Sequence, residues 1–589
     1  QYAGIMRYDN SNGEKIGIRP QPDSNESAYR WNWDSPLIIS PHKTDRLYFA
    51  ANYLFQSDDR GNSWKKISDD LTRNEDRNKK KVMGKIWSVD AIFKNVFTSP
   101  LGTIVSLDES RIKEGMIVVG TDDGLVQVTK DNGVSWKKFE NFPGIPSRSY
   151  VTDVVASKHD VNTIYVTFNY HKYGDYKPYI IKTSDGGSSW KMISSNLPKN
   201  NFVWSVVEDH INSNILFVGT EFGMYYSING GANWNKFKDV PTIAIRDLEI
   251  HEGEDDLVAA SFGRGFYIVD DYSPIREVSK DFLLKDAHLF SVKDALQFII
   301  ASPEKSATGH NFFTSPNPPY GVKLSYYLKE RLISKEDRRQ KEEKSKFNKS
   351  ESINYPSKDQ LDEEIKEEKP KIFLTIESLN GDIVRRVEGN NSPGYNETYW
   401  NLRTYSYRNI EDENNYSGPL VPPGTYNVHL SKYENNTFTE LTEKQSFEVI
   451  QHGSKSTQKE RFDLYNFQLK FDKLFSDFEK LVDNIDDAIE DVNGEINTVI
   501  NSKSATNVNY MHMKKSKLMD LRMILTGKLS LNYADVFSGS PPSIQRRLGG
   551  MSWELSNTTS RQTKSHEKTY NISKKKYDEV VKMFKEIIG

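Results

Sequence analysis

Four copies of one short pattern restrict the fold of this chain more than any other feature. The pattern is Ser/Thr-x-Asp-x-Gly-x-x-Trp, and its copies occupy residues 57–64, 129–136, 183–190 and 227–234. Strand-like runs rich in Tyr, Val, Ile and Phe flank each copy, and another such run precedes each unit. Successive tryptophans are 72, 54 and 44 residues apart, near the roughly 40 to 50 residues of a four-stranded propeller blade. The spacing therefore predicts radially repeated β-sheets.

The repeated pattern predicts a hairpin that maintains the fold and takes no part in catalysis. Its Asp side chain can accept hydrogen bonds from the turn's own N–H groups, its Gly supplies a positive φ, and its Trp buries a large aromatic surface between neighbouring sheets. Asn229 replaces Asp in the fourth copy, which keeps the accepting oxygen but loses the charge that an acid catalyst needs. The predicted structural residues are Asp59, Gly61, Trp64, Asp131, Gly133, Trp136, Asp185, Gly187, Trp190, Asn229, Gly231 and Trp234.

Composition excludes several functional classes. Of the 589 residues, 36% are hydrophobic, which is enough for several domain cores. Lys and Arg number 79 against 82 Asp and Glu, with no basic half, so nucleic-acid binding has no electrostatic footprint. The chain has no cysteine, which excludes disulfides and thiolate metal sites, and no apolar run approaches the roughly 20 residues of a membrane helix. HExxH, GxSxG, phosphate-loop and EF-hand motifs are absent, so we predict no catalytic residue, metal site or cofactor.

The four motifs resemble the Asp-box, or BNR repeat, of sialidases, sortilin-like receptors and xyloglucanase-type hydrolases, where it is a structural hairpin. Longer segments, among them "VGTDDGLVQVTKDNGVSWKK", "VAASFGRGFYIVDDYSPIREV" and "PLVPPGTYNVHL", resemble the C-terminal portion of large exported bacterial β-propeller proteins labelled sortilin-like or glycosyl hydrolase. The resemblance implies an exported protein at the cell surface, at the outer membrane or in the periplasm. It also implies further blades, because "GIMRYDNSNGEKIGIRP" (4–20) reads as the outer hairpin of a blade without inner strands.

We expect a mainly β chain with three parts. Residues 1–274 are predicted to form about five Asp-box β-propeller blades and a part, an incomplete ring that an upstream segment or a companion chain completes. Residues 285–450 are predicted to form an Ig-like β-sandwich with Trp400 in its core, interrupted by a charged insertion (335–371) that we expect to be a solvated or disordered loop. Residues 457–589 are predicted to form an α-helical bundle, because apolar residues from Phe467 to Val492 alternate spacings of four and three.

One group of residues is a candidate ligand site. It lies at the starts of the predicted inner strands, which converge on the central channel of a propeller, and arginines there can clamp a carboxylate while aromatic rings stack on a sugar or peptide. Its members are Arg30, Trp31, Trp33, Arg148, Tyr150, Trp204, Arg246 and Asp247. The same residue types also plug propeller channels, and sialidases use arginines for catalysis, so three interpretations stay open: plugging, binding and glycosidase action. A second patch, the Tyr-rich stretch 169–179, favours protein or glycan contact or a packed sheet edge.

The functional expectation is a non-catalytic scaffold. It binds a protein or glycan partner through the propeller, while the sandwich and helices dock it into a larger assembly. The alternative is a xyloglucanase-like or sialidase-like glycoside hydrolase acting on extracellular glycans, which requires a pair of carboxylates about 5 to 10 Å apart in an open groove.

Overall fold

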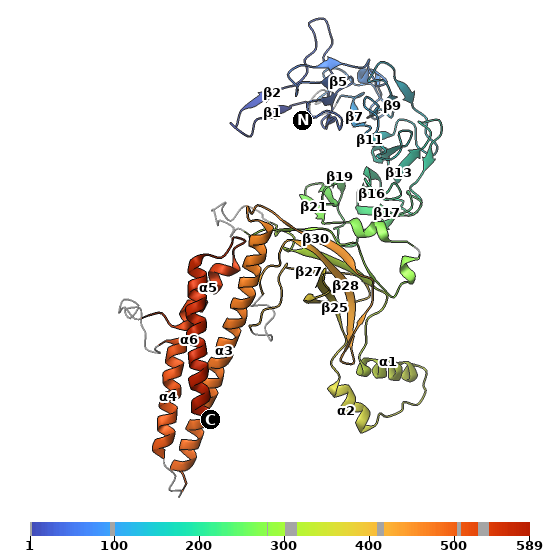
Figure 1. The fold of residues 1–589 in the computed structure, drawn as a ribbon. Helices are drawn as coiled ribbons and strands as arrows, with labels where there is room; N and C mark the ends of the chain where they lie inside the picture. Colours follow the sequence, from blue (N-terminus) through green and yellow to red (C-terminus); the bar gives the residue numbers. More distant parts are fainter. Residues whose placement is uncertain are drawn as a thin grey trace. The chain divides into compact units, whose positions relative to one another are not determined.

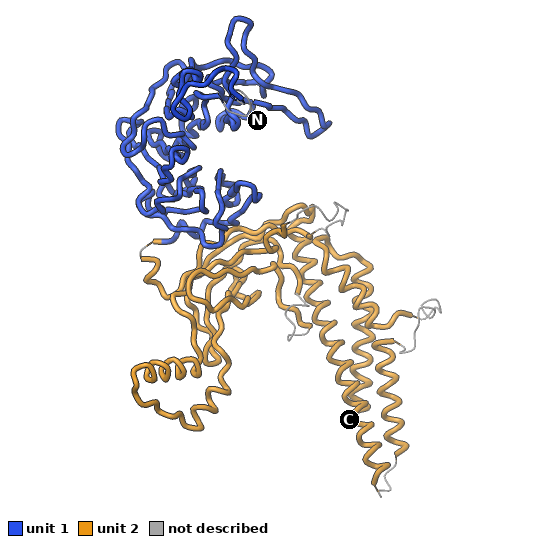
Figure 2. Tube along the Cα trace, turned by 180° about the vertical axis from the view of Figure 1, so that it is seen from behind, with its two compact units in different colours: residues 1–278 blue, residues 279–589 orange. Residues whose placement is uncertain are grey.

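The computed structural model describes residues 3–92, 94, 100–279, 281–300, 315–408, 418–502, 508–527 and 541–589. These residues form two compact units, residues 1–278 (unit 1) and residues 279–589 (unit 2) (Figures 1 and 2). The chain is mainly β up to about residue 451 and helical afterwards, as the sequence predicts.

Unit 1 consists of small antiparallel sheets that follow one another along the chain. An N-terminal hairpin pairs β1 (Met6–Tyr8) with β2 (Lys15–Gly17). Four four-stranded sheets follow, each in sequential strand order. Sheet 1 contains β3 (Leu37–Ile39), β4 (Leu47–Ala50), β5 (Leu54–Ser57) and β6 (Lys65–Lys66), and sheet 2 contains β7 (Ile104–Glu109), β8 (Ile117–Thr121), β9 (Val126–Thr129) and β10 (Lys137–Phe139). Sheet 3 contains β11 (Tyr150–Ala156), β12 (Ile164–Tyr170), β13 (Asp175–Thr183) and β14 (Lys191–Met192), and sheet 4 contains β15 (Val203–Glu208), β16 (Leu216–Thr220), β17 (Gly223–Ser227) and β18 (Asn235–Lys236). Sheet 5 has three strands, β19 (Ile245–His251), β20 (Asp256–Ser261) and β21 (Phe266–Val269). This strand order is that of propeller blades.

Each sheet packs on the next through a buried apolar cluster. Tyr48 and Leu54 of sheet 1 share one cluster with Ile104 and Ile117 of sheet 2. Corresponding clusters join sheets 2 and 3, sheets 3 and 4, and sheets 4 and 5. Because both faces of such a sheet are covered, its central strand is apolar throughout instead of alternating, and β8 and β16 are buried at every position.

The sheets of unit 1 follow an open arc (Figure 2, blue). At the end of the arc formed by sheet 5, the last strand exposes Phe266 and Ile268 to 74% and 57%. The corresponding strands β5 and β9 of sheets 1 and 2 are buried at every position. Sheet 5 therefore presents an apolar face of the kind that the other sheets cover.

Unit 2 begins with two sheets that share one core. The first is antiparallel: β22 (Ala287–Leu289), β24 (Val322–Leu328) and β27 (Gly394–Trp400). The second is mixed, with β23 (Ala295–Gln297) parallel to β30 (Gln445–Gln451), followed by β28 (Gly424–Glu434), β25 (Lys371–Ser378) and β26 (Ile383–Gly389), and with β29 (Thr437–Glu440) on β28. Trp400 is 1% exposed, and its Nε1 donates to the carbonyl oxygen of Arg403 at 2.8 Å. The expected core position of Trp400 is confirmed.

The charged insertion is helical, so the prediction of a loop was wrong. It holds α1 (Lys335–Asn348) and α2 (Lys358–Lys366), each begun by a serine capping box. Arg339 of α1 joins the two helices by an ion pair with Glu364 of α2 at 2.8 Å, and it also pairs with Glu343 one turn along its own helix at 3.3 Å. Neither helix has a buried residue, so caps and side-chain ion pairs stabilise a segment that lacks apolar burial.

The C-terminal segment forms four helices around one apolar core: α3 (Gln458–Ile500), α4 (Val508–Thr526), α5 (Ile544–Ser556) and α6 (Lys564–Ile588). The predicted stripe of α3 faces this core, with Phe471, Leu474 and Ile485 among its buried members. In the part of the chain that the structure describes, no helix combines the length and apolarity of a membrane span.

Candidate binding surface

Each copy of the repeated pattern, called an Asp-box here after the motif that it resembles, forms its hydrogen bonds within its own turn. In the third copy, Thr183 Oγ1 accepts from the N–H of Gly187 at 2.9 Å and donates to Asp185 Oδ1 at 2.8 Å. Asp185 also accepts from the N–H and the hydroxyl of Ser189, at 2.8 and 2.6 Å. These bonds lower the pKa of Asp185 to about 2, and equivalent bonds do the same for the aspartates of the first two copies. The carboxylates are thus held ionised by their own turns, which is unsuitable for proton transfer at neutral pH.

The glycine of each box lies against the preceding sheet. All four glycines have φ between +84° and +87°, and a Cβ on each would press on one residue of the element before it. The pairs are Gly61 with Ile18, Gly133 with Ile67, Gly187 with Phe139, and Gly231 with Ile193. Ile18, at the end of the N-terminal hairpin, therefore contacts the first box in the same way as residues at the outermost strands of sheets 1, 2 and 3 contact the later boxes.

The tryptophans lie at the same boundaries between sheets. Trp64, Trp136, Trp190 and Trp234 each belong to, or pack against, the cluster shared with the preceding element. Trp64 Nε1 donates to Ile18 O at 2.6 Å, and Trp234 Nε1 donates to Ile193 O at 2.7 Å. Within the described residues, the buried Nε1 atoms of Trp136 and Trp190 have no acceptor.

Two of the arginines predicted to bind a ligand instead connect parts of unit 1. Arg30 donates to Asp70 at 2.6 Å and, from its Nε, to the carbonyl oxygen of Gly102 at 2.9 Å. Arg148 makes a bidentate pair with Glu75, at 2.7 and 2.6 Å. Because their donors are occupied by protein groups, these arginines are engaged structurally.

The first three aromatic candidates are dispersed. Trp31 is 4% exposed and stacks on Phe49 with centroids 4.7 Å apart, so it belongs to the core. Trp33 is 46% exposed. Tyr150 is partly buried, with Lys172 Nζ 5.4 Å from its ring, and burial raises its pKa.

Trp204 and Arg246 form the most distinctive pair. They occupy equivalent positions at the starts of β15 and β19, beside the register irregularity that both strands share. The guanidinium of Arg246 lies 3.5 Å from the ring centroid of Trp204 and 5.5 Å from that of Phe262. Trp204 Nε1 donates to Glu221 at 2.9 Å, which fixes the indole. No hydrogen bond or ion pair engages the Arg246 guanidinium among the residues that the structure describes.

Two residues of the Tyr-rich stretch 169–179, His171 and Tyr176, contact Phe202, the aromatic residue beside Trp204. His171 stacks on Phe202 at 4.9 Å with an interplanar angle of 10°, and Phe202 meets Trp204 edge-on at 4.9 Å. Tyr176 reaches Phe202 at 6.5 Å. Burial lowers the pKa of His171, so its ring is held neutral at physiological pH.

These contacts define one aromatic–arginine surface across sheets 3, 4 and 5. Tyr176 is 49% exposed and Phe262 is 72% exposed, while Phe202, which Tyr176 contacts, is buried. The surface consists of His171, Tyr176, Phe202, Trp204, Arg246 and Phe262. A cation stacked between rings with its N–H edges unengaged suits a carboxylate ligand.

Most of the candidate carboxyl groups near the inner strands accept hydrogen bonds from protein groups. Glu208 is fully buried and accepts from Ser157, from the N–H of Lys158 and from Tyr165. Asp153 accepts from the N–H of Val206 at 3.0 Å. Burial raises the pKa of Asp153 well above its ordinary value, and the nearby charge of Asp247 adds to this.

Asp247 is the remaining candidate. Its carboxylate accepts from the N–H of Leu248 at 2.9 Å, and partial desolvation raises its pKa. No group of three His, Cys, Asp or Glu side chains among the described residues has a metal-binding arrangement.

Sequence reasoning missed Phe202 and Phe262 as members of the surface, and Glu221 as the acceptor that fixes Trp204. Phe202 directly precedes β15, and Glu221 and Phe262 lie in the turns after β16 and β20. The positions of these residues could have been predicted from the sequence. In an antiparallel sheet of sequential strands, the turn after the second strand lies at the same edge as the start of the first strand.

No protein-family profile matches the chain, and no curated protein matches it. Similar solved structures include a GH74 xyloglucanase from Xanthomonas campestris (16% identity, 41% of this chain and 37% of that chain, TM-score 0.30). Others are YCF48 bound to D1 peptide (18%, 29% and 52%, 0.22) and the Swd1 β-propeller domain of Myceliophteria thermophila (12%, 62% and 88%, 0.30). The chain covers well under half of the xyloglucanase. No sequence family is thereby assigned, and these likenesses identify no function.

Proposed function

We propose that this protein is a non-catalytic binding scaffold whose aromatic–arginine surface takes a carboxylate-bearing segment of a protein or glycan. The observation that carries the proposal is Arg246, stacked 3.5 Å from Trp204 with no partner for its N–H groups among the described residues. A guanidinium in this position offers paired donors to a carboxylate while the adjacent rings cover the ligand's apolar part.

The surroundings support binding over turnover. The Asp-box carboxylates are bound within their own turns, and Glu208 is buried among three protein donors. Neither type of carboxylate is free to act on a substrate. The aromatic members come from three successive sheets, so the surface is positioned by a packed framework.

The remaining parts of the proposal concern partners and location. We propose an exported Asp-box protein of the cell surface, outer membrane or periplasm, resembling the sortilin-like group. Its two-sheet module (residues 285–450) is Ig-like, and it and the helices dock the protein into a larger assembly. We further propose that a blade-like sheet from an upstream segment or a companion chain covers the exposed Phe266 and Ile268 of sheet 5.

The binding proposal is tested with acidic and neutral ligands of matched size. Oligogalacturonate and a short peptide with a free C-terminal carboxylate are compared with neutral oligosaccharides and the amidated peptide, by titration calorimetry. At least one carboxylate ligand is expected to bind, and R246Q is expected to weaken it about tenfold or more, since a hydrogen bond to a charged group contributes about 1.5 to 3 kcal/mol. R60Q, which removes an exposed arginine bound to Asp45, serves as the control. Equal affinities for R246Q and the wild type would reject this surface.

A glycoside hydrolase is the second candidate, and one observation favours it. Burial raises the pKa of both Asp153 and Asp247, and the charge of Asp247 raises the pKa of Asp153 further, as is common for paired carboxyl groups at hydrolase sites. Release of reducing ends from xyloglucan or of sialic acid from sialyl-lactose, abolished by D247N, would replace the binding proposal with this one.

A further inference from the structure

Helix α4 has exposed apolar side chains beside its core-facing leucines. Leu518, Leu521 and Leu525 are buried in the bundle core. Next to them, Met513 and Ile524 are 61% and 43% exposed. The apolar surface of α4 therefore extends from the core onto an exposed flank of the helix, whereas a surface helix normally confines it to the face that it buries.

The exposed residues of α4 border a groove. It lies between α4 and the last turns of α6 and has a volume of about 530 Å³. Tyr510, Met513 and Ile524 line it from α4, and Met583 and Ile587 line it from α6. Methionine side chains adapt to varied apolar partners, and Met-lined grooves commonly bind amphipathic helices.

Charged side chains border the groove in a fixed order. Lys514 and Lys517 are followed one turn later on α4 by Asp520, and Glu586 of α6 also lines the groove. Within the described part of the chain, neither lysine forms an ion pair. A helix docked here therefore meets two unpaired cations and then Asp520 along α4, with Glu586 on the α6 side of the groove.

We infer that this groove binds an amphipathic helix of a partner protein, with acidic residues facing Lys514 and Lys517 and a basic residue facing Asp520. The α4 residues that line the groove run from Tyr510 to Ile524, which corresponds to about 21 Å, or about four turns of the bound helix. The inference names the contact for the docking role proposed above, and it depends on α4 and α6 alone.

Two other occupants fit less well. A membrane surface is flat and anionic lipid would be repelled by Asp520 and Glu586, which line the groove itself. A second copy of α3 is strongly acidic, but its apolar stripe is buried in the bundle core, so it has no apolar face to insert.

The test uses two synthetic 18-residue helical peptides with the same composition and the same leucine stripe. The matched peptide carries glutamates toward Lys514 and Lys517 and a lysine toward Asp520; the reversed peptide exchanges these charges. Fluorescence anisotropy with the full chain is expected to give at least tenfold tighter binding of the matched peptide. The double variant K514E/K517E is expected to invert this preference, and M513E is expected to weaken both peptides at least tenfold.

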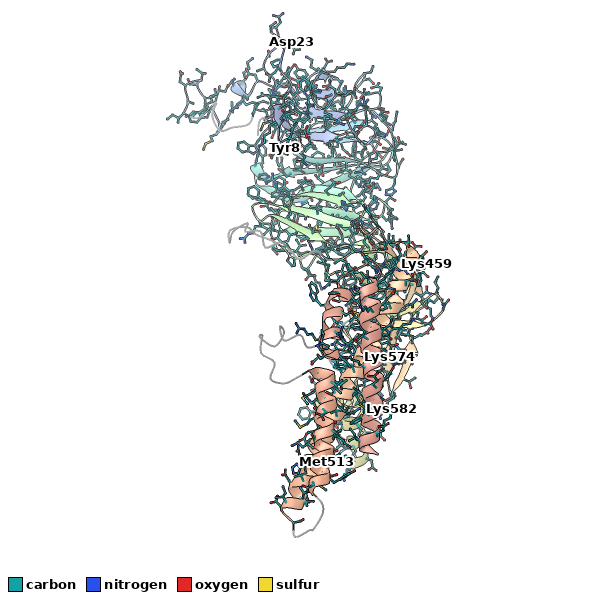
Figure 3. All side chains as sticks on the ribbon, turned by 60° about the vertical axis from the view of Figure 1, so that its left-hand side comes forward. Tyr8, Asp23, Lys459, Met513, Lys574 and Lys582 are labelled. Atoms are coloured by element: carbon teal, nitrogen blue, oxygen red, sulfur yellow. The ribbon has the colours of Figure 1, made fainter. Side chains whose placement is uncertain are left out.

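The control is K459E, at the start of α3, which Figure 3 places at the opposite end of the bundle from Met513. Circular dichroism checks that each variant keeps its helices. Equal affinity for the two peptides, or no binding, overturns the inference. So does binding to phosphatidylserine vesicles, or self-association in sedimentation, that M513E abolishes. R246Q leaves peptide binding unchanged, which separates this test from that of the aromatic–arginine surface.

Discussion

Replacing single glycines with alanine tests whether the Asp-boxes hold successive sheets together. Gly133 has φ +87°, and a Cβ there would overlap the carbonyl oxygen of Ile67 in the preceding sheet. Gly186 has φ +67°, but a Cβ there would meet the flexible end of Lys130 at 3.2 Å and Asn162 Oδ1 at an ordinary contact distance of 3.6 Å. The first copy has Arg60 at the position of Gly186, with φ +59°, so a side chain is tolerated at that point of the turn.

The two substitutions share one energetic cost and differ in another. Left-handed φ costs a residue with a Cβ about 1 to 2 kcal/mol at either position. Pressing on the backbone of the neighbouring sheet adds about 1 to 3 kcal/mol at Gly133 alone, as overpacking does in cores. We therefore expect G186A to reduce the free energy of unfolding by about 1 to 2 kcal/mol and G133A by about 2 to 5 kcal/mol.

Urea unfolding followed by tryptophan fluorescence measures this difference. Of the ten tryptophans, Trp400 and Trp553 alone lie outside residues 1–278, so the signal reports mainly on unit 1. The midpoint for G133A is expected well below that for G186A at similar slopes. Equal losses would refute the reasoning, because the φ cost is common to both variants and only the contact between sheets differs.

Contacts in both units lead to four further predictions. W234F is expected to cost about 1 to 2 kcal/mol more than W190F in urea unfolding, because only Trp234 donates its indole N–H, to Ile193 at 2.7 Å. Burial raises the pKa of Asp108 to about 7, so ionisation of this carboxyl group opposes folding. The free energy of unfolding of unit 1 is therefore expected to fall as pH rises from about 4 to 7, and D108N is expected to reduce this dependence on pH. The Asp-box aspartates act oppositely, since their pKa of about 2 means that their stabilisation is lost as pH falls from about 4 to 2. R339A is expected to speed hydrogen exchange in both α1 and α2, because this arginine joins them, whereas equal rates would contradict that role.

The repeated features of the fold were accessible from sequence. A Gly-and-Trp turn recurring between strand-like runs predicted several four-stranded sheets, and the alternation from Phe467 to Val492 predicted α3, because both depend on local spacing. The charged insertion was mispredicted, since its composition has few apolar residues and its helices depend on serine caps and on ion pairs between segments about 25 residues apart, such as Arg339 with Glu364.

The candidate surface was only partly accessible. Trp204 and Arg246 were identified because both start inner strands, but the same rule selected Arg30 and Arg148, whose donors are used by Asp70 and Glu75. Whether a guanidinium is engaged depends on loops far away in sequence, which periodicity does not encode.

Disulfide trapping tests the central claim most directly, namely that each Asp-box is seated on the sheet before it. The chain has no cysteine, so an introduced pair has no competitor. A Cβ at Gly231 would lie 3.0 Å from the Cβ of Ile193, whereas a Cβ at Gly230 has only Asn214 nearby, at 3.7 Å. Disulfides join Cβ atoms about 3.5 to 4.5 Å apart, so the Gly231 pair reaches this range after moving apart by about 0.5 Å. Under mild oxidation, I193C/G231C is predicted to give an internal disulfide by mass spectrometry while I193C/G230C stays reduced; equal oxidation of both pairs, or of neither, would contradict the account.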